Sequence, residues 1–445
     1  MPKRHPSTHP EFNFGHALAD SEAVESESLV KPHQDLQAFD LGEQIKVFNE
    51  FDKQTLIEDV RYEALDGSLK TVPCYLNEFW TAKQRQAHSL QEVSYRACFK
   101  PQLPAFFIDR LTQEGDVVYD PFMGRGTTLL EAGLKGRIPF GCDINPLSQH
   151  LLLPRLFPPL QSAVENRLKQ LDWDIVGDIP EELLVFYHPE TLKAICSLRD
   201  YLMRREASGE IDEIDRWIRL VAINRLTGHS PGFFSVYSMP PNQAVSVKSQ
   251  KRINERRSQT PPMRDICAII LKKSRGLLKG VTESETNTLR SIFSKAKLVV
   301  GPSDQTPQIK ENTVSLVVTS PPFLDVVDYA TDNWLRCWFV GLDAKSIKIT
   351  IAKKVEAWEE VMTRVLIELY RVLKSGGHIA FEVGEVRKGS VKLEESVLKC
   401  GERAGLVPQL VMINAQQFTK TANCWGVDNN AKGTNSNRIV IFRKD

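Results

Sequence analysis

The stretch Val314-Ser315-Leu316-Val317-Val318-Thr319-Ser320-Pro321-Pro322-Phe323 joins an apolar run directly to a hydroxyl residue, two prolines and an aromatic ring. The apolar run has the length and β-branched content of a buried strand. Because proline fixes φ and lacks an N–H, the chain must leave the sheet along one rigid course. Open α/β sheets bind ligands at such carboxyl ends of central strands. We therefore expect a pocket whose carbonyls accept hydrogen bonds from an exocyclic amino group and where Phe323 stacks on a flat ring.

An earlier strand, Asp116 to Asp120, leads into a second ligand-binding stretch, Asp120-Pro121-Phe122-Met123-Gly124-Arg125-Gly126-Thr127-Thr128. The two glycines allow a ligand to approach the backbone closely. A nicotinamide dinucleotide loop would need a third glycine where Leu129 stands. It would also place a pyrophosphate where the Asp120 carboxylate would repel it. A carboxylate at this position instead suits the cationic amino-acid end of S-adenosylmethionine.

These two motifs together resemble those of one enzyme family. Ser320-Pro321-Pro322-Phe323 resembles the catalytic motif of the S-adenosylmethionine-dependent DNA amino-methyltransferases, in the form typical of cytosine-N4 enzymes, and residues 120–128 resemble the same family's cofactor loop. The resemblance implies an α/β fold of the class I methyltransferase (Rossmann-like) type. This fold has a mixed seven-stranded sheet, here with an inserted, mainly helical target-recognition region. It also implies that Ser320, Pro321, Pro322 and Phe323 form the catalytic pocket.

Further residues are expected to hold the cofactor, S-adenosyl-L-methionine. Asp143 ends the next strand, where an acid can accept hydrogen bonds from both ribose hydroxyls; its alternative role is to cap the following helix. Phe99-Lys100-Pro101 resembles the family segment that packs over the methionine end, although a solvated lysine at a helix start explains it equally well. The expected cofactor-binding residues are Lys100, Asp120, Pro121, Phe122, Gly124, Gly126, Thr127, Thr128, Asp143, Asn145 and Asp304.

A third region interrupts the alternation of strands and helices. Residues 151–297 have helical periodicity and contain Lys248 to Arg257, a run with five positive charges and one negative charge. Because the whole chain has a net charge of only +1, this concentration favours contact with nucleic-acid phosphates over a merely solvated helix face. The residues expected to bind DNA are Lys248, Lys251, Arg252, Arg256 and Arg257. His229 is expected to be structural.

The amino-acid composition argues against several other classes of protein. The chain is 42% hydrophobic and 25% charged, and it has no apolar run of membrane-spanning length. Its eight cysteines are scattered without a Cys-x-x-Cys pair, which argues against a zinc site and favours the reducing cytoplasm. We expect a loosely ordered tail (1–54), a cofactor-binding half (55–150), the recognition insertion (151–297) and a catalytic half (298–445).

The sequence thus predicts a site-specific DNA methyltransferase of the restriction-modification type that acts on cytosine N4 in double-stranded DNA. The resemblance implies a cognate restriction endonuclease as a partner, and no membrane or metal. Alternatives are adenine-N6 methylation of DNA, amino-methylation of an RNA base, and, more remotely, a non-catalytic nucleic-acid-binding module. Ser320 favours cytosine because adenine-N6 relatives usually carry Asp at that position.

Overall fold

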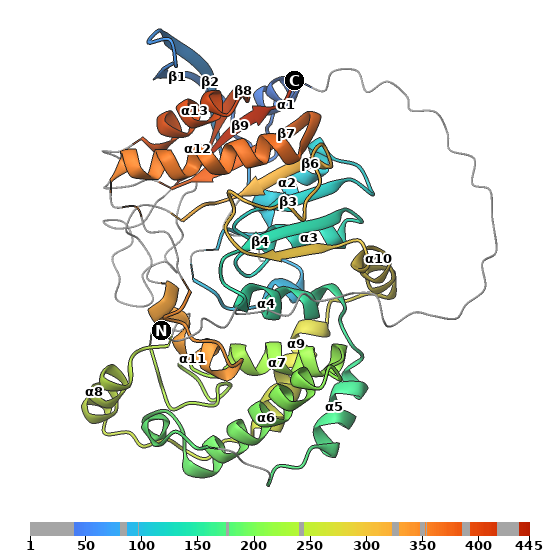
Figure 1. The fold of residues 1–445 in the computed structure, drawn as a ribbon, viewed down its shortest axis with the longest axis vertical. Helices are drawn as coiled ribbons and strands as arrows, with labels where there is room; N and C mark the ends of the chain where they lie inside the picture. Colours follow the sequence, from blue (N-terminus) through green and yellow to red (C-terminus); the bar gives the residue numbers. More distant parts are fainter. Residues whose placement is uncertain are drawn as a thin grey trace, which may run out of the picture. The chain divides into compact units, whose positions relative to one another are not determined.

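One mixed sheet organises the computed structural model of the chain (Figure 1). The structure describes residues 40–80, 87–96, 98–174, 178–239, 244–322, 329–347, 352, 354–384, 392–415 and 436–445. Their strands are β1 (Leu56–Glu63), β2 (Leu69–Asn77), β3 (Val117–Asp120), β4 (Ile138–Asp143), β5 (Lys297–Val300), β6 (Val314–Thr319), β7 (Leu373–Val383), β8 (Val407–Ala415) and β9 (Ser436–Arg443). They form a nine-stranded sheet in the order β1-β2-β8-β9-β7-β6-β3-β4-β5.

The centre of this sheet has a topological switch point. From β3 the chain runs outward to β4 and then β5, whereas β6 and β7 lie on the other side of β3, and all these neighbours are parallel. The register of β3 on β6 pairs Val118 with Leu316 and Tyr119 with Val317. The loops after β3 and β6 therefore leave the same edge of the sheet side by side, where doubly wound sheets bind ligands. The predicted α/β class is confirmed by this topology.

The predicted number of seven strands is wrong for the described residues, because β1 and β2 add a hairpin beyond β8. Seven strands remain when this hairpin is set aside, in the order β8-β9-β7-β6-β3-β4-β5, and β9 is antiparallel to both of its neighbours. The hairpin escaped prediction because β1 is mostly exposed and interleaves charged residues with apolar ones. Tyr62 of β1 attaches the hairpin to the segment before β8, because its hydroxyl donates a hydrogen bond to Glu402 at 2.8 Å.

Helices cover both faces of the sheet. On one face α2 (Gln102–Leu111), α3 (Thr127–Leu134) and α10 (Glu283–Phe293) lie near the central strands, and on the other lie α12 (Val355–Val372) and α13 (Leu393–Arg403). The apolar side of α12, including Val365, Leu366 and Leu369, packs against Val317 and Phe381 of the sheet. This burial fixes where α12 stands relative to the end of β6.

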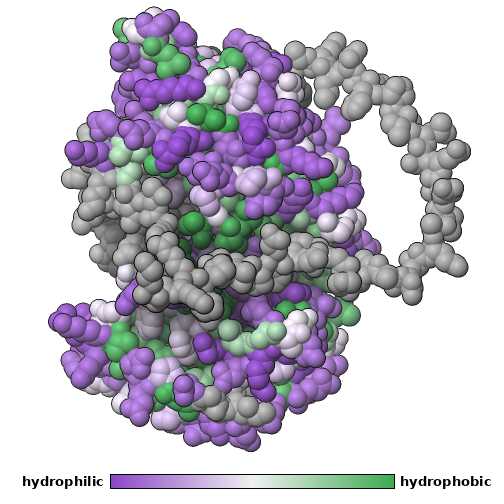
Figure 2. Space-filling model, in the orientation of Figure 1, coloured by the Kyte–Doolittle hydropathy of each residue, from purple (hydrophilic) through white to green (hydrophobic). Residues whose placement is uncertain are grey.

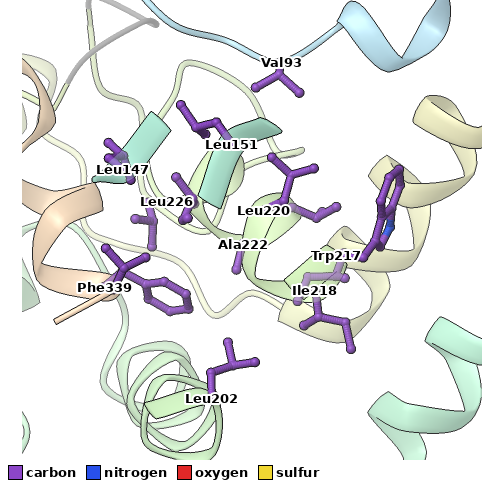
Figure 3. Packing of buried hydrophobic residues seen from close by; sticks show 14 of the residues in the cluster. Val93, Leu147, Leu151, Leu202, Trp217, Ile218, Leu220, Ala222, Leu226 and Phe339 are labelled. Carbon is purple, nitrogen blue, oxygen red and sulfur yellow. The ribbon is translucent and has the colours of Figure 1, made fainter. Parts of the chain in front are cut away.

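The remaining helices form a separate layer with its own core. They are α4 (Leu147–Leu156), α5 (Gln161–Gln170), α6 (Pro189–Ala207), α7 (Glu213–Arg225), α8 (Val247–Arg257), α9 (Ile266–Leu278) and α11 (Tyr329–Phe339), with short 3-10 turns at Ser89–Gln91 and Glu181–Val185. Figure 3 shows Leu226, which follows α7, near Leu151 and Phe339, with Leu220 and Trp217 further to the right in the same cluster. None of the helices in the described part of the chain is long and apolar enough to span a membrane.

This helical layer is built from two distant parts of the sequence. The predicted helical insertion supplies most of it, and α11, which follows the Ser-Pro-Pro stretch, completes it. Ala244 donates a backbone hydrogen bond to the carbonyl of Asp332 at 3.2 Å, and Arg199 Nε donates to the carbonyl of Trp338 at 3.0 Å. The segment that follows the predicted pocket is therefore attached to the insertion.

The structure describes the last part of the predicted tail (1–54), from residue 40 onward. Residues 1–39 lie outside the described residues, and α1 spans Leu41–Lys46. Ile45 and Phe48 are buried, and the ring of Phe48 lies 5.3 Å from that of Phe79 and 6.0 Å from that of Phe106. Because Ile45 and Phe48 are buried, residues 42–54 contribute to the core although most of the segment is polar.

Candidate functional site

A cavity of about 210 Å³ opens at the carboxyl ends of β3, β4 and β6. Asp120 and Ser320, from the two stretches identified in the sequence, both line it. The strands bearing them are joined by the Thr319 hydroxyl, which donates to Asp120 Oδ1 at 2.6 Å. The described residues that line it are Tyr95, Arg96, Cys98, Phe99, Asp120, Phe122, Met123, Gly124, Thr127, Asp143, Ile144, Asn145, Pro302, Ser303, Asp304, Ser320, Pro322, Ala352, Trp358, Val361, Met362, Arg364 and Val365.

The glycine loop after β3 has a conformation that other residues would not tolerate. Gly124 and Gly126 have φ of 49° and 77°, in the left-handed region. A Cβ on Gly126 would lie 2.7 Å from the Leu152 side chain, so α4 packs against the bare backbone there. The Gly124 amide donates to Asp143 Oδ2 at 2.8 Å. The loop is thereby tied to the end of the neighbouring strand β4.

Two arginines fix the loop from behind. Arg125 donates to the carbonyl of Val93 at 2.6 Å, and the fully buried Arg155 donates to the carbonyls of Leu90 and Arg125. Burial lowers the pKa of Arg155 to about 9, so at neutral pH the guanidinium stays protonated and its donors satisfy carbonyls that water cannot reach. Their role is to hold the loop.

The cavity presents buried carboxyl groups from neighbouring strands. Burial raises the pKa of Asp120 to about 7, although hydrogen bonds from Thr319 and the Phe122 amide favour the ionised form. Burial likewise raises the pKa of Asp143, against hydrogen bonds from the amides of Asn145 and Gly124. The groups that act most strongly on the pKa of Asp120 include no cation. A cationic ligand would supply the missing opposite charge.

The far end of the cavity carries two more predicted residues. Asp304 accepts a hydrogen bond from Arg364 Nε at 3.0 Å, and both side chains line the cavity. Asn145 also lines it, while its side-chain oxygen accepts the Leu147 amide at 3.0 Å at the start of α4. Asn145 therefore combines a place in the cavity wall with a hydrogen bond to the first turn of α4.

The Ser-Pro-Pro stretch is held by side chains that sequence reasoning did not identify. The Trp358 indole on α12 donates to the Pro322 carbonyl at 3.0 Å, so this carbonyl is already engaged, contrary to the expectation that both proline carbonyls serve the pocket. The buried Glu382 on β7 accepts a hydrogen bond from Asn437 Nδ2 at 2.9 Å, and it follows Phe381, the register partner of Thr319, just as Ser320 follows Thr319. Phe323 lies outside the described residues.

Several predicted cofactor residues support the cavity without lining it. The Ser303 hydroxyl donates to the carbonyl of Pro121 at 2.5 Å, and the Thr128 hydroxyl donates to the carbonyl of Val318 at 3.1 Å. Gly126 provides the close approach to α4, and Pro321 is buried beside the lining residues Ser320 and Pro322. Lys100 is exposed and does not line the cavity, whereas Cys98 and Phe99 do.

The basic helix α8 has two different sides. Gln250 Nε2 donates to the carbonyl of Tyr237 at 3.0 Å, and Asn254 Nδ2 donates to the carbonyl of Val185 at 2.7 Å. These two amides attach the helix to the rest of the helical layer. The five predicted DNA-binding cations are all exposed: Lys248, Lys251, Arg252, Arg256 and Arg257. The area of Figure 2 that corresponds to α8 in Figure 1 is correspondingly hydrophilic.

Comparison with known proteins agrees with the site. Residues 34–151 match a family model described as DNA methylase. The chain is 25% identical over 291 residues to the type II methyltransferase M.BsoBI of Geobacillus stearothermophilus, covering 58% of this chain and 53% of the relative. It is 34% identical over 128 residues to the type II methyltransferase M.MvaI of Kocuria varians, covering 28% and 25%. It is also 31% identical over 134 residues to a tRNA (guanine(10)-N2)-dimethyltransferase of Methanocaldococcus jannaschii, covering 29% and 36%.

The alignments span about half of the longest-matching relative and less of the others. The family match confirms the resemblance predicted from the two motifs, and S-adenosyl-L-methionine is the cofactor that this family uses. The cavity fits this cofactor, because the sulfonium and the amino group of S-adenosyl-L-methionine are cationic and burial, the largest cause of the raised pKa of Asp120, would be offset by such a charge.

Proposed function

We propose that this chain, whose residues 34–151 carry the methylase domain of the DNA amino-methyltransferases, methylates cytosine N4 at specific sites in double-stranded DNA. The methyl donor is S-adenosyl-L-methionine, and the acceptor is the exocyclic amino group of a base flipped out of the duplex. One observation carries the proposal: Asp120 at the end of β3 and Ser320 at the end of β6 line a single cavity.

The β3 and β4 side of the cavity would hold the cofactor. Asp120 would face the cationic amino-acid end, Asp143 the ribose hydroxyls, and Asn145 and Asp304 the adenine. When bound, the cofactor supplies a methyl group on a sulfonium, which is displaced in line by a nitrogen nucleophile. The chain itself needs only to align the two partners, since positioning alone can supply a large part of such a rate enhancement. No metal is required by this chemistry.

The β6 side would hold the target base. A base in a duplex cannot reach a cavity at a sheet edge, so it must be extruded at a cost of a few kcal/mol. Stacking on Phe323 would offset this by about 1–3 kcal/mol. The amino nitrogen is a weak nucleophile because its lone pair is conjugated with the ring. A hydrogen bond from its N–H to the Ser320 hydroxyl or the Pro321 carbonyl would orient that lone pair toward the methyl group.

The helical layer would hold the duplex. The cations of α8 are exposed while its amide side chains anchor it, which suits a helix that neutralises phosphates. We place target recognition in residues 151–297, and we assign site-specific modification alongside a cognate endonuclease as the role in the cell. The strength of binding should therefore fall with salt concentration.

The test is incubation of the purified chain with labelled S-adenosyl-L-methionine and unmethylated plasmid DNA, followed by mass analysis of the released nucleosides. N4-methylcytosine is expected. N6-methyladenine would move the target to adenine while leaving the amino-transfer chemistry intact. Ser320→Ala is the matched control, which should lose transfer while retaining cofactor affinity. Absence of any methylated nucleoside from an enzyme that binds the cofactor would overturn the proposed function on DNA.

A second substrate class follows from the similarity to the tRNA dimethyltransferase. The acceptor named for that relative is also an exocyclic base nitrogen, so the same cavity chemistry would serve an RNA base. Parallel reactions with unmodified bulk tRNA separate the two substrates. Label in tRNA but not in plasmid DNA would replace the DNA assignment.

A further inference from the structure

A group of basic side chains from three helices lies beside the cavity and has no role in the function described above. Lys273 Nζ on α9 donates to the carbonyl of Glu92 at 2.8 Å. Arg336 Nη2 on α11 donates to the carbonyl of Ser94 at 3.3 Å. The residue that follows Ser94 is Tyr95, which lines the cavity. Both cations are therefore attached to the short segment that leads into the cavity wall.

The third cation, Arg225, is the last residue of α7 and lies at the same segment. Its neighbour Asn224 accepts the Ser94 amide on Oδ1 at 2.7 Å, which fixes the end of α7 against this part of the chain. The pKa values agree with this proximity. Burial, and then the charge of Arg336, lower the pKa of Arg225 to about 10, and burial and Arg225 lower the pKa of Lys273.

Arg225 is held by groups that do not neutralise its charge. Its Nε donates to the carbonyl of Asn224 at 2.8 Å, and its guanidinium carbon lies 4.0 Å from the centre of the buried Phe233 ring. Neither partner is an acid, and the ion pairs within the described part of the chain do not include Arg225. Lys273 has one carboxylate nearby, that of the exposed Glu92 at 3.7 Å. Because cations withdrawn from water are costly without a counter-ion, an anionic ligand would stabilise this group.

The stacking of Arg225 on an aromatic ring suits one kind of anion. A guanidinium is a planar fork of N–H donors, and a ring beneath it fixes the orientation of that plane. Such a fork matches two oxygens of a phosphate group, to which it can donate two parallel hydrogen bonds. Lys273 would add a point charge from the neighbouring helix.

A continuous set of contacts joins this group to the basic helix α8. The guanidinium carbon of Arg257 on α8 lies 3.9 Å from the centre of the Tyr237 ring. Tyr237 forms a β-bridge with Gly228, and a Cβ on Gly228 would lie 2.4 Å from the Phe233 ring. Phe233 in turn lies under Arg225. Cations thus occur at both ends of one loop, which suits a chain of phosphates better than a single small anion.

We propose that Arg225 and Lys273 bind a phosphodiester group of the DNA strand that carries the target base, beside the nucleotide extruded into the cavity. This inference rests on the proposed function and deepens it, because it adds to the α8 face a second contact with the DNA backbone, next to the cavity. Phosphate contacts position a duplex without reading its sequence. The site therefore contributes to affinity and placement, whatever the recognition sequence is.

The first test measures binding of a labelled duplex over a range of salt concentrations, in the presence of S-adenosylhomocysteine. Arg225→Gln should weaken binding by about tenfold near 0.1 M salt and reduce the slope of log affinity against log salt by about 1. Lys273→Gln should act in the same direction, and it carries the test if Arg225→Gln does not fold. Cofactor affinity, measured without DNA, should be retained in both variants.

The matched control is Arg290→Gln on α10. The Arg290 guanidinium also lies over an aromatic ring, 5.2 Å from the centre of Phe157, so the variant removes the same charge and the same kind of stacking elsewhere. It should leave DNA affinity and the salt slope unchanged. Equal losses in Arg290→Gln and Arg225→Gln, or unchanged affinity and slope in Arg225→Gln and Lys273→Gln, would overturn the inference.

The second test locates the phosphate. Once the target base is mapped, duplexes are made with a single neutral methylphosphonate at successive positions of the target strand around that base. In the wild-type protein one position beside the base should weaken binding by about tenfold. In Arg225→Gln the same substitution should cost less than about threefold, because the cation that contacts this phosphate is gone. Losses that remain additive at every position would show that Arg225 only supports the fold, and would overturn the inference.

Failure of this site and failure of the proposed function give different results. A wild-type protein that methylates DNA, with variants that bind DNA as the wild type does, would remove the phosphate site alone. A wild-type protein that yields no methylated nucleoside would remove the proposed function. Binding of bulk tRNA that is weakened in Arg225→Gln, with binding of duplex DNA unaffected, would overturn the assignment of the site to DNA.

Discussion

Two regions of the molecule differ in where their charged groups lie: the cavity at the ends of β3 and β4 buries them, and the outer side of α8 exposes them. In the cavity, carboxyl groups are buried, and their pKa values are raised by that burial. On α8 the charged groups are exposed, and neutral amides make the attachments. Buried charge is prepared for one ligand of fixed shape, whereas exposed charge suits a long polyanion met at many positions. Variants in the two regions can test this difference.

The largest effect is expected from Asp120→Asn. Loss of the carboxylate should weaken S-adenosyl-L-methionine binding by about 10- to 100-fold, the value of a charge-assisted hydrogen bond. The same change should stabilise the free protein at pH 8. Because the folded pKa of Asp120 is raised from 3.8 to about 7, its contribution to stability is present below 3.8 and lost as pH rises through about 7. Titration calorimetry and thermal unfolding measure the two effects.

The gain in stability should be at most about 4 kcal/mol at pH 8 and should vanish near pH 4. Asp304→Asn is the matched control, because that carboxylate is paired with Arg364 at the rim and removing it should stabilise nothing. If Asp120→Asn kept full cofactor affinity, or destabilised the free protein at pH 8, the contrast between the two regions would be lost.

An intermediate effect is expected on α8. Lys251→Gln combined with Arg252→Gln should weaken DNA binding by about tenfold near 0.1 M salt and reduce the slope of log affinity against log salt by about 2. Thermal stability and cofactor affinity should stay as in wild type, because both side chains are exposed. Binding titrations over a range of salt concentrations measure the slope.

The matched control is the double variant Lys279→Gln with Lys295→Gln, which replaces two exposed lysines on either side of α10. It lowers the net charge of the protein by the same amount as the α8 variant does. In Figure 1 α10 lies at the right, beside the sheet, and α8 lies at the lower left, in the helical layer. An equal fall in DNA affinity in the control would mean that net charge, and not the α8 face, drives binding.

The smallest effect is expected from Trp358→Phe, which removes the indole donor to the Pro322 carbonyl and keeps an aromatic ring. A neutral hydrogen bond is worth about 0.5–1.5 kcal/mol, so transfer should slow by roughly 2- to 10-fold. Trp173→Phe, which removes an indole hydrogen bond to the Leu168 carbonyl in the helical layer, should leave the rate unchanged. Rapid-quench measurements of one turnover give both rates; equal losses would indicate a general packing effect.

Much of the fold was predictable because its central strands and helices have patterns that can be recognised within a short stretch of sequence. The strands at Val117–Asp120 and Val314–Thr319 are short apolar runs followed by turn residues, and α12 has a clear helical period. The β1–β2 hairpin was missed because an edge hairpin buries little of β1, so its sequence carries a weak pattern. The packing of Phe48 against Phe79 and Phe106 was missed for another reason: a few aromatic side chains in a polar segment have no period to detect.

The site residues that belong to a recognisable motif were predictable. Those that reach the site only through the packing of distant segments were not. Asp120, Asp143 and Ser320 come from recognisable loops, and the structure places them around one cavity. Trp358 and Glu382 lie within an ordinary amphipathic helix and an ordinary buried strand. Their positions beside Pro322 and Ser320 follow only from the packing of α12 and the register of β6 on β7, which are tertiary facts. Lys100 shows the converse, since its motif pointed to the cavity while the structure places Phe99 there.

The pairing of β2 with β8 has a consequence for how this protein is made. Cys74 is level with Val411, and Tyr62 reaches Glu402 across a separation of 340 residues. On the ribosome the first hairpin is synthesised long before its neighbouring strand exists. Such remote pairing slows folding and leaves a strand edge open meanwhile. The edge of β2 at Cys74 to Asn77, which β8 pairs in the finished fold, is then the segment that a chaperone would have to shield until translation nears its end.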